Sequence, residues 1–162
     1  MNGLKIKFNA VERIYDAYSW RLTRRAKKAW SSGIMVGNKS HGQTAEFEKS
    51  MAKYTKRKYA IAVGSGTDAL YFALKAKGIG PGKKVVCPAV SYMATAEAIK
   101  RTGAYIDFVD VNKNALIDNI GIRSKPDAVV YVNLFGNLAD YDYLKKYCND
   151  NRIPLIEDAA QS

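Results

Sequence analysis

The sequence contains few of the residues that build disulfide frameworks or metal centres. Its two cysteines, Cys87 and Cys148, lie far apart and form no CxxC pair, so we expect two buried, reduced thiols. With His41 as the single histidine, the sequence predicts no metal site. Reduced thiols are typical of a reducing compartment, and we therefore expect a cytoplasmic protein.

Long apolar runs and low-complexity segments are also missing. No apolar stretch approaches the roughly 20 residues that span a bilayer, and residues 1–16 lack the apolar segment of a signal peptide. Gly and Pro are scattered, so no flexible linker is expected, and no repeat of fixed period occurs. These absences argue against a membrane protein or a repeat architecture. The 162 residues suffice for one domain with a sizeable core.

Negative charge is scarce. The sequence has 26 Lys and Arg against 15 Asp and Glu, a net charge of +11, and residues 1–30 hold eight of these bases and two of the acids. Such a surplus favours anionic partners, either nucleic acid or phosphorylated small molecules. On the basic face from Arg21 to Lys28 no aromatic residues interleave for base stacking. A solvated helix face therefore explains these charges better than nucleic-acid binding.

Periodicity separates a helical N-terminal arm, residues 1–58, from an α/β body, residues 59–162. In the arm, apolar residues at three- and four-residue steps predict an amphipathic helix over 11–30. A glycine-containing loop follows, and Thr44 is expected to cap a second helix.

The body alternates short apolar runs with helical segments. This alternation predicts an α/β fold with a mainly parallel sheet flanked by helices and joined by right-handed crossovers. The expected strands are 59–63, 84–87, 104–109, 128–132 and 153–156, and the expected helices are 67–77, 94–101 and 141–149.

A glycine- and hydroxyl-rich turn, Gly64–Leu70, follows the first expected strand. Amides at the following helix N-terminus, with the Ser and Thr hydroxyls, would make an anion pocket. The two glycines and Ala69 also fit a dinucleotide-binding pattern, although the next strand ends in Cys87–Ala89 where that pattern needs an acid. A Walker loop is excluded because no Gly-Lys-Ser/Thr closes the turn. An ordinary turn with Thr67 as a helix cap stays open.

Two more strand ends carry aromatic or polar residues. Tyr92 follows the second strand and can lay its ring against a ligand, although a core tyrosine is an equal interpretation. The last strand runs into Glu157 and Asp158, with Gln161 nearby. Asp158 can face a protonated ring nitrogen or cap a further helix. Because ligands of open α/β sheets bind beyond the carboxyl ends of the strands, the three strand ends together suit a phosphorylated heteroaromatic cofactor such as pyridoxal phosphate.

Six motifs occur in a fixed order along the chain. They are Glu46-Phe47-Glu48; Gly64-Ser65-Gly66-Thr67-Asp68-Ala69-Leu70; Gly78-Ile79-Gly80-Pro81-Gly82; Ala94-Thr95-Ala96-Glu97 followed by Gly103-Ala104; Asn133-Leu134-Phe135-Gly136; and Glu157-Asp158-Ala159-Ala160-Gln161-Ser162. On these motifs, residues 37–162 resemble the N-terminal portion of the DegT/StrS-type aminotransferases. These are pyridoxal-phosphate enzymes of fold type I that aminate nucleotide-linked keto-sugars.

The resemblance implies pyridoxal 5'-phosphate as the cofactor, a nucleotide-diphospho-keto-sugar as the substrate and a glutamate-like amino donor. It also implies a homodimer and a role in amino-sugar and surface-polysaccharide biosynthesis. By the resemblance, the cofactor-binding residues are Gly66, Thr67 and Asp68 at the phosphate, Tyr92 on the ring in place of the family's usual phenylalanine, Asp158 at the ring nitrogen and Gln161 near the 3-hydroxyl.

The chain departs from the family pattern in three places. The family's Schiff-base lysine, with a phosphate-binding serine, lies further along the chain than residue 162, and no lysine present here stands in that motif. We therefore assign no catalytic residue and expect the 162 residues alone to be inactive. The loop 38–43 is longer than the usual glycine turn, and Gly82-Lys83-Lys84 replaces a typically acidic pair. The open alternatives are a basic nucleic-acid-binding protein, an NAD-binding module and a catalytically inert cofactor-binding module.

Overall fold

The computed structural model describes residues 10–34, 42–118, 122 and 125–162. It contains two compact units, Met1–Ala62 and Val63–Ser162. His41 and most of the loop 38–43 lie outside the described residues. The division into a helical arm, residues 1–58, and an α/β body, residues 59–162, stays a prediction. Across the described part of the chain, no helix is long and apolar enough to cross a membrane.

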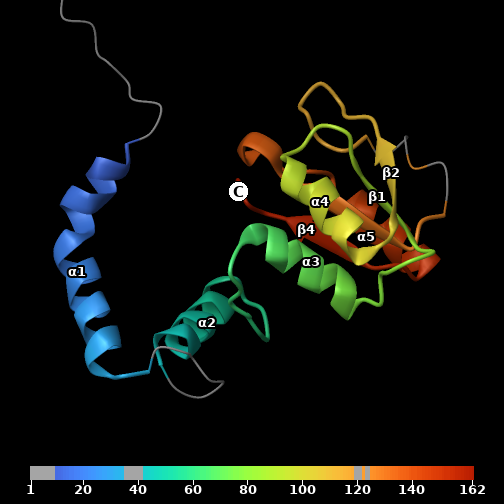
Figure 1. Ribbon diagram of the computed structural model, residues 1–162. Helices are drawn as coiled ribbons and strands as arrows, with labels where there is room; N and C mark the ends of the chain where they lie inside the picture. The colour runs from blue at the N-terminus through green and yellow to red at the C-terminus, as the bar shows by residue number, and fades with distance from the viewer. Residues whose placement is uncertain (1–9, 35–41, 119–121, 123–124) are drawn as a thin grey trace, which may run out of the picture. The chain divides into compact units, whose positions relative to one another are not determined.

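The first unit contains helices α1, Val11–Ser31, and α2, Gln43–Tyr54 (Figure 1). The helix expected over 11–30 is confirmed. The expected cap at Thr44 is wrong, because α2 begins at Gln43 and Gly42 is its N-cap. Gly42 has a φ of 96°, a left-handed geometry that glycine adopts without a steric penalty.

The basic face of α1 also differs from the sequence interpretation. Trp20 lines a surface hollow together with the basic residues of this face, and the Arg21 guanidinium carbon lies 5.1 Å from the Trp20 ring centre. An aromatic ring therefore does accompany these charges. The nearby Glu46 carboxylate accepts hydrogen bonds from Arg25 at 2.9 Å and from Lys28 at 3.2 Å.

The strand expected over residues 59–63 is wrong. In the described part of the chain this segment pairs with no other strand, and Tyr59 and Ile61 expose 73% and 81% of their surface. The amide of Ala62 donates instead to the Glu48 carboxylate at 2.8 Å. An apolar run becomes a strand only beside a neighbour that takes up its backbone amides and carbonyls, and this segment has none among the described residues.

The second unit is built on a parallel sheet of four strands in the order β2-β1-β3-β4 (Figure 1). The apolar run of β3 is buried along its whole length, as expected for a central parallel strand. The fold class predicted from the sequence is confirmed. The strands are β1 Lys84–Pro88, β2 Tyr105–Val109, β3 Ala128–Val132 and β4 Leu155–Asp158; the helices are α3 Gly66–Ala76, α4 Met93–Thr102 and α5 Tyr141–Asn151, with a short 3₁₀ helix η2 at Leu134–Gly136.

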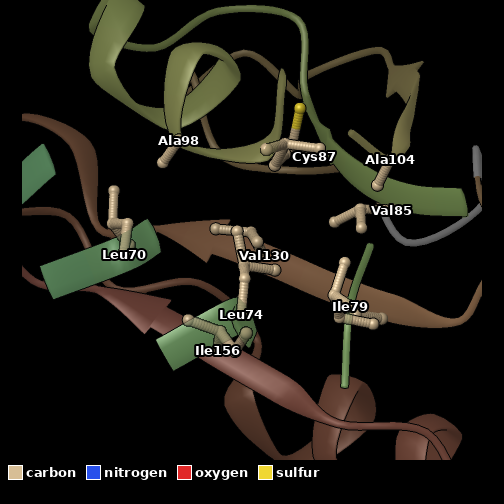
Figure 2. Packing of buried hydrophobic residues seen from close by; sticks show 11 residues of the cluster. Leu70, Leu74, Ile79, Val85, Cys87, Ala98, Ala104, Val130 and Ile156 are labelled. Atoms are coloured by element: carbon tan, nitrogen blue, oxygen red, sulfur yellow. The ribbon is translucent and has the colours of Figure 1, made fainter. Parts of the chain in front are cut away.

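Helices cover both faces of this sheet. Residues of α3 and α4 pack on one face, where Leu70 and Leu74 meet Val130 and Ile156 (Figure 2). On the other face Leu144 and Cys148 of α5 join a second cluster with residues of β1 and β3. The two apolar layers fix the helices relative to the strands and so determine where the helix N-termini lie.

The last strand lies two residues later than expected. Arg152 ends α5 in a left-handed conformation, and the Ile153 amide donates to the Cys148 carbonyl, so the chain turns before it joins the sheet. β4 therefore contains Glu157 and Asp158, with Asp158 in register with Val132 of β3. The shift makes the carboxylates part of the strand rather than of a loop after it.

Candidate functional site

The strand order creates a switch point between β1 and β3. From β1 the chain continues to β2 on one side, whereas β3 and β4 lie on the other. Ligands of open α/β sheets bind outside the carboxyl ends of the strands at such a point. The N-termini of α3 and α4 lie toward the same side of the unit as the carboxyl end of β4 (Figure 1).

The N-terminus of α3 carries the glycine- and hydroxyl-rich turn. Ser65 is the N-cap, and its hydroxyl oxygen accepts a hydrogen bond from the Asp68 amide at 3.1 Å. The cap is thus Ser65 rather than Thr67. The first amides of an α-helix have no acceptor within the helix. Gly66 and Thr67 occupy those positions, and this end of α3 can receive an anion.

Asp68 is engaged within the protein. Its carboxylate lies 3.0 Å from Nη1 of Arg101 on α4, and Ser65 Oγ donates to it at 3.1 Å. Arg101, and after it Ser65, lower the pKa of Asp68 below its ordinary value. The amide of Asp68 donates to Ser65, and a charged carboxylate repels phosphate. The structure therefore gives Asp68 the geometry of a residue that joins α3 to α4.

Tyr92 occupies the N-cap position of α4, directly after the turn that follows β1. Its side chain is 73% exposed. Within the described residues, Tyr92 therefore lies on the surface and not in the core. A ring at this position can stack on a flat ligand held between the strand ends.

Asp158, at the end of β4, is held at both carboxylate oxygens. Thr95 Oγ1 donates to Oδ2 at 3.0 Å, and the Ala160 amide donates to Oδ1 at 3.2 Å. The main chain of Asp158 is fixed as well, because its carbonyl accepts from the Asn133 amide at 3.2 Å. The carboxylate is therefore an oriented group at the carboxyl end of the sheet.

Asn133, immediately after β3, holds the end of β4 through its side chain. It is 3% exposed, donates from Nδ2 to Glu157 at 2.7 Å and accepts at Oδ1 from the Ala139 amide at 3.1 Å. Both functions of this buried amide are satisfied, which makes it a rigid element of the site.

Gln161 contacts the turn after β3. Its Oε1 accepts from the Phe135 amide at 2.7 Å, and Phe135 stands in the left-handed region with φ 57°. A left-handed conformation is uncommon for a bulky residue and requires support from its surroundings. The Gln161 side chain supplies part of that support.

Sequence reasoning did not assign roles to Thr95, Asn133 or Arg101. Each contacts a residue that was singled out, or its neighbour, across 24 to 63 positions of sequence. One signal was available for Asn133, since an amide directly follows the all-apolar run of β3. Thr95 gave a weaker signal, because small residues surround it in α4.

The donors and acceptors present fit a phosphorylated pyridine. The N-terminus of α3 offers amides and the Thr67 hydroxyl for the phosphate, Tyr92 offers an exposed ring, and Asp158 offers an oriented carboxylate for a protonated ring nitrogen. Within residues 10–34, 42–118, 122 and 125–162, no group of three or more His, Cys, Asp and Glu side chains is arranged to hold a metal ion.

Known proteins are similar to this chain in both sequence and fold. The chain is 36% identical over 133 residues to UDP-2-acetamido-2-deoxy-3-oxo-D-glucuronate aminotransferase of Pseudomonas aeruginosa, an alignment that covers 75% of this chain and 37% of the relative. It is 37% identical over 122 residues to GDP-perosamine synthase of Caulobacter vibrioides, covering 72% and 33%. The chain thus spans about a third of the length of these relatives.

Two solved structures illustrate the shared fold. A DegT DnrJ EryC1 StrS aminotransferase from Brucella abortus superposes with a TM-score of 0.89 at 30% identity, covering 98% of this chain and 45% of that one. NtdA from Bacillus subtilis, solved with bound cofactor PMP, gives 0.89 at 27% identity, covering 100% and 38%. The family model of the DegT/DnrJ/EryC1/StrS aminotransferases matches residues 23–162, and the chain therefore belongs to this family.

Proposed function

We propose that the chain forms the cofactor-binding portion of a pyridoxal-phosphate-dependent aminotransferase that acts on a nucleotide-diphospho-keto-sugar. The observation that carries the proposal is the set of groups in the second unit: the α3 N-terminus, the exposed Tyr92, and Asp158 oriented by Thr95. The aminotransferase family, and relatives named for UDP- and GDP-linked sugars, support the reaction class.

At the phosphate, we assign the direct contacts to Gly66 and Thr67. Their amides lie in the first turn of α3, where an anion is stabilised by the helix dipole as well as by hydrogen bonds. The Thr67 hydroxyl adds a donor. Asp68, named with them from the family resemblance, is proposed to act through its ion pair with Arg101, which fixes α3 against α4.

At the ring, we assign stacking to Tyr92, the ring nitrogen to Asp158 and the 3-hydroxyl region to Gln161. When bound, pyridoxal phosphate supplies an electron sink for cleavage of bonds at the amino-acid α-carbon. Asp158 favours the protonated ring nitrogen through its opposite charge at hydrogen-bond range. Gln161 is exposed and already held at Oε1 by Phe135, which orients its amide group.

The remaining features follow from the family. We propose a glutamate-like amino donor, a role in amino-sugar and surface-polysaccharide biosynthesis, and a cytoplasmic homodimer. One relative is the spore coat polysaccharide biosynthesis protein SpsC of Bacillus subtilis, 38% identical over 122 residues. We further propose that the 162 residues alone do not transfer amino groups, because none of their lysines stands in the family's Schiff-base motif.

The test is binding of pyridoxal phosphate to the purified 162-residue chain, measured by calorimetry. We expect binding that inorganic phosphate weakens by competition at the α3 N-terminus, and no amino transfer from glutamate to a nucleotide-linked keto-sugar. Thr67→Val should weaken binding, whereas Thr44→Val in α2 is the matched control. Undetectable cofactor binding, or unchanged affinity in Thr67→Val, would contradict the assignment.

Two of the three open alternatives are tested with the same material. Affinity for a DNA duplex that falls steeply with salt would favour a nucleic-acid-binding protein, since phosphate contacts release counterions. Saturable binding of NAD in place of pyridoxal phosphate would favour the dinucleotide module. We expect neither outcome.

A further inference from the structure

Thr95 is a buried hydroxyl in contact with the proposed cofactor carboxylate. It lies in the first turn of α4, is 2% exposed, and its Oγ1 is 3.0 Å from Asp158 Oδ2. Ser91 Oγ, in the turn before α4, lies 2.9 Å from the same Thr95 oxygen. Three side chains from β4, α4 and the preceding turn are thus connected in series.

The chemistry of the three groups fixes the direction of these hydrogen bonds. An ionised carboxylate only accepts, so Thr95 donates its single hydroxyl proton to Asp158. Ser91 must then be the donor to Thr95, because Thr95 has no second proton to give. The result is a directed chain from Ser91 through Thr95 to the carboxylate, in which each bond strengthens the next.

We propose that Thr95 is a positioning residue that fixes the side-chain rotamer of Asp158 and so aims its carboxylate at the ring nitrogen of the cofactor, with Ser91 orienting the Thr95 hydroxyl. The fixed rotamer follows from the geometry of this chain. The role toward the cofactor rests on the proposed function.

Three properties suit Thr95 and its helix to this task. As a β-branched residue within a helix, threonine has few accessible rotamers, so its hydroxyl direction is determined by the position of α4. Its burial keeps water from competing for the carboxylate oxygen. The first turn of a helix also favours a nearby negative charge. The position of Asp158 therefore depends on α4 as well as on its own strand.

The first experiment measures the Asp158 rotamer in the 162-residue chain without cofactor. Three-bond couplings between the Asp158 backbone nitrogen and its carboxyl carbon report whether χ1 is fixed or averaged. We expect a single-rotamer value in the unaltered chain, an averaged value in Thr95→Val, and a value near the original in Thr95→Ser.

The matched control is Thr102→Val. Thr102 is another buried threonine of α4, 5% exposed, whose hydroxyl donates to the Ile99 carbonyl and accepts from the Ala104 amide. The same substitution there removes a buried hydroxyl away from the site and should leave the Asp158 coupling unchanged. A fixed rotamer in Thr95→Val, or averaging in both valine variants, would overturn the inference.

The second experiment tests the role toward the cofactor. We expect Thr95→Val to weaken pyridoxal-phosphate binding roughly tenfold, the loss typical of one hydrogen bond to a charged group. The ¹⁵N shift of the labelled ring nitrogen should move toward its unprotonated value, and Thr95→Ser should restore both readouts. Ser91→Ala should act in the same direction but less strongly; a larger effect than that of Thr95→Val would contradict the directed chain.

The two proposals fail in different ways. If the unaltered chain binds no pyridoxal phosphate, the proposed function is wrong, while the coupling measurement still decides whether Thr95 fixes Asp158. If the chain binds the cofactor and Thr95→Val leaves both the affinity and the ring-nitrogen shift unchanged, the proposed function stands and the positioning role is overturned.

Discussion

Helices α1 and α4 have similar sequence patterns and different surroundings. Both are amphipathic, but the apolar side chains of α1 are exposed, with Ile14 at 59% and Leu22 at 55%, whereas Ala98 and Ile99 of α4 are fully buried. In α4 the apolar stripe packs on the sheet. Periodicity therefore predicts that a helix forms and which face is apolar, but burial depends on a surface for that face to cover.

The same contrast applies to polar groups. In α4 the buried Thr95 hydroxyl is held by two partners, while the charges of α1 meet Glu46 at an exposed surface. The α/β unit can thus hold a side chain in one geometry, which a cofactor site requires. Substitutions matched between the two units test this contrast.

The largest expected effect is on stability. Leu74→Ala removes a side chain with 0% exposure from the core in Figure 2 and should lower the free energy of unfolding by about 2–5 kcal/mol. The matched Leu22→Ala in α1 should change it by less than about 0.5 kcal/mol. Urea unfolding followed by circular dichroism measures both. Similar losses in the two variants would mean that the α1 face is covered in solution.

The next effect concerns catalysis in a protein that joins this chain to the remaining length found in its relatives. In the proposed role, the Asp158 charge favours the protonated ring nitrogen. Asp158→Asn keeps the shape but removes this charge, so amino transfer should slow by more than about 100-fold. Cofactor affinity should fall less, because the α3 N-terminus is unchanged. Asp16→Asn in α1 is the control. Near-normal turnover of Asp158→Asn in steady-state assays would show that Asp158 has another role.

The thiols should show a smaller, pH-dependent effect. Burial, with the Asp107 charge as a second cause, raises the pKa of Cys87 to about 12, and burial raises the pKa of Cys148 to about 11. Both pKa values exceed the ordinary thiol pKa of 9.0. The two protonated thiols therefore contribute fully to stability below about pH 9, and this contribution is lost as the pH rises toward their pKa values in the folded state. At pH 8 neither thiol should react with a thiol reagent until denaturant is added. Thr23→Cys in α1 provides an exposed thiol for comparison, and equal native rates would refute the prediction.

The smallest effect should come from the exposed ion pairs. The hydrogen bond from Arg101 is the main cause of the lowered pKa of Asp68. The hydrogen bond from Lys28 is the main cause of the lowered pKa of Glu46. Such pairs stabilise the folded state at pH values above the ordinary carboxyl pKa. This contribution is lost as the pH falls through the lowered carboxyl pKa of the folded state. Asp68→Asn should slightly lower the melting temperature at pH 7 and low salt, and Glu46→Gln should leave the α/β transition unchanged. Adding salt should erase the Asp68 effect, since exposed pairs are screened.

Local patterns were sufficient to predict most of the fold. The helices and the strands β1 to β3 depend on periodicity and short apolar runs, which are properties of neighbouring residues. Residues 59–63 show the same pattern but do not form a strand, because pairing needs a partner strand from elsewhere in the chain. The two-residue shift of β4 has a similar cause, since the left-handed Arg152 delays entry into the sheet.

The site could be predicted only in part. Sequence motifs singled out Tyr92 and Asp158, and the structure places both at strand ends as expected, although their cofactor roles remain predictions. The Asn133–Glu157 and Thr95–Asp158 hydrogen bonds join segments that have no local relation. They become visible only when the sheet brings β1, β3 and β4 side by side.

The strand order has a consequence for the order in which the unit folds. Thr95 is synthesised 63 residues before Asp158, and β4 follows every other described strand. Before β4 joins the sheet, the Thr95 hydroxyl lacks the Asp158 partner that it has in the folded unit. The Asp158 carboxylate reaches Thr95 only when β4 docks beside β3. We therefore expect the Thr95–Asp158 hydrogen bond to form late in folding, because it joins residues that are far apart in the sequence.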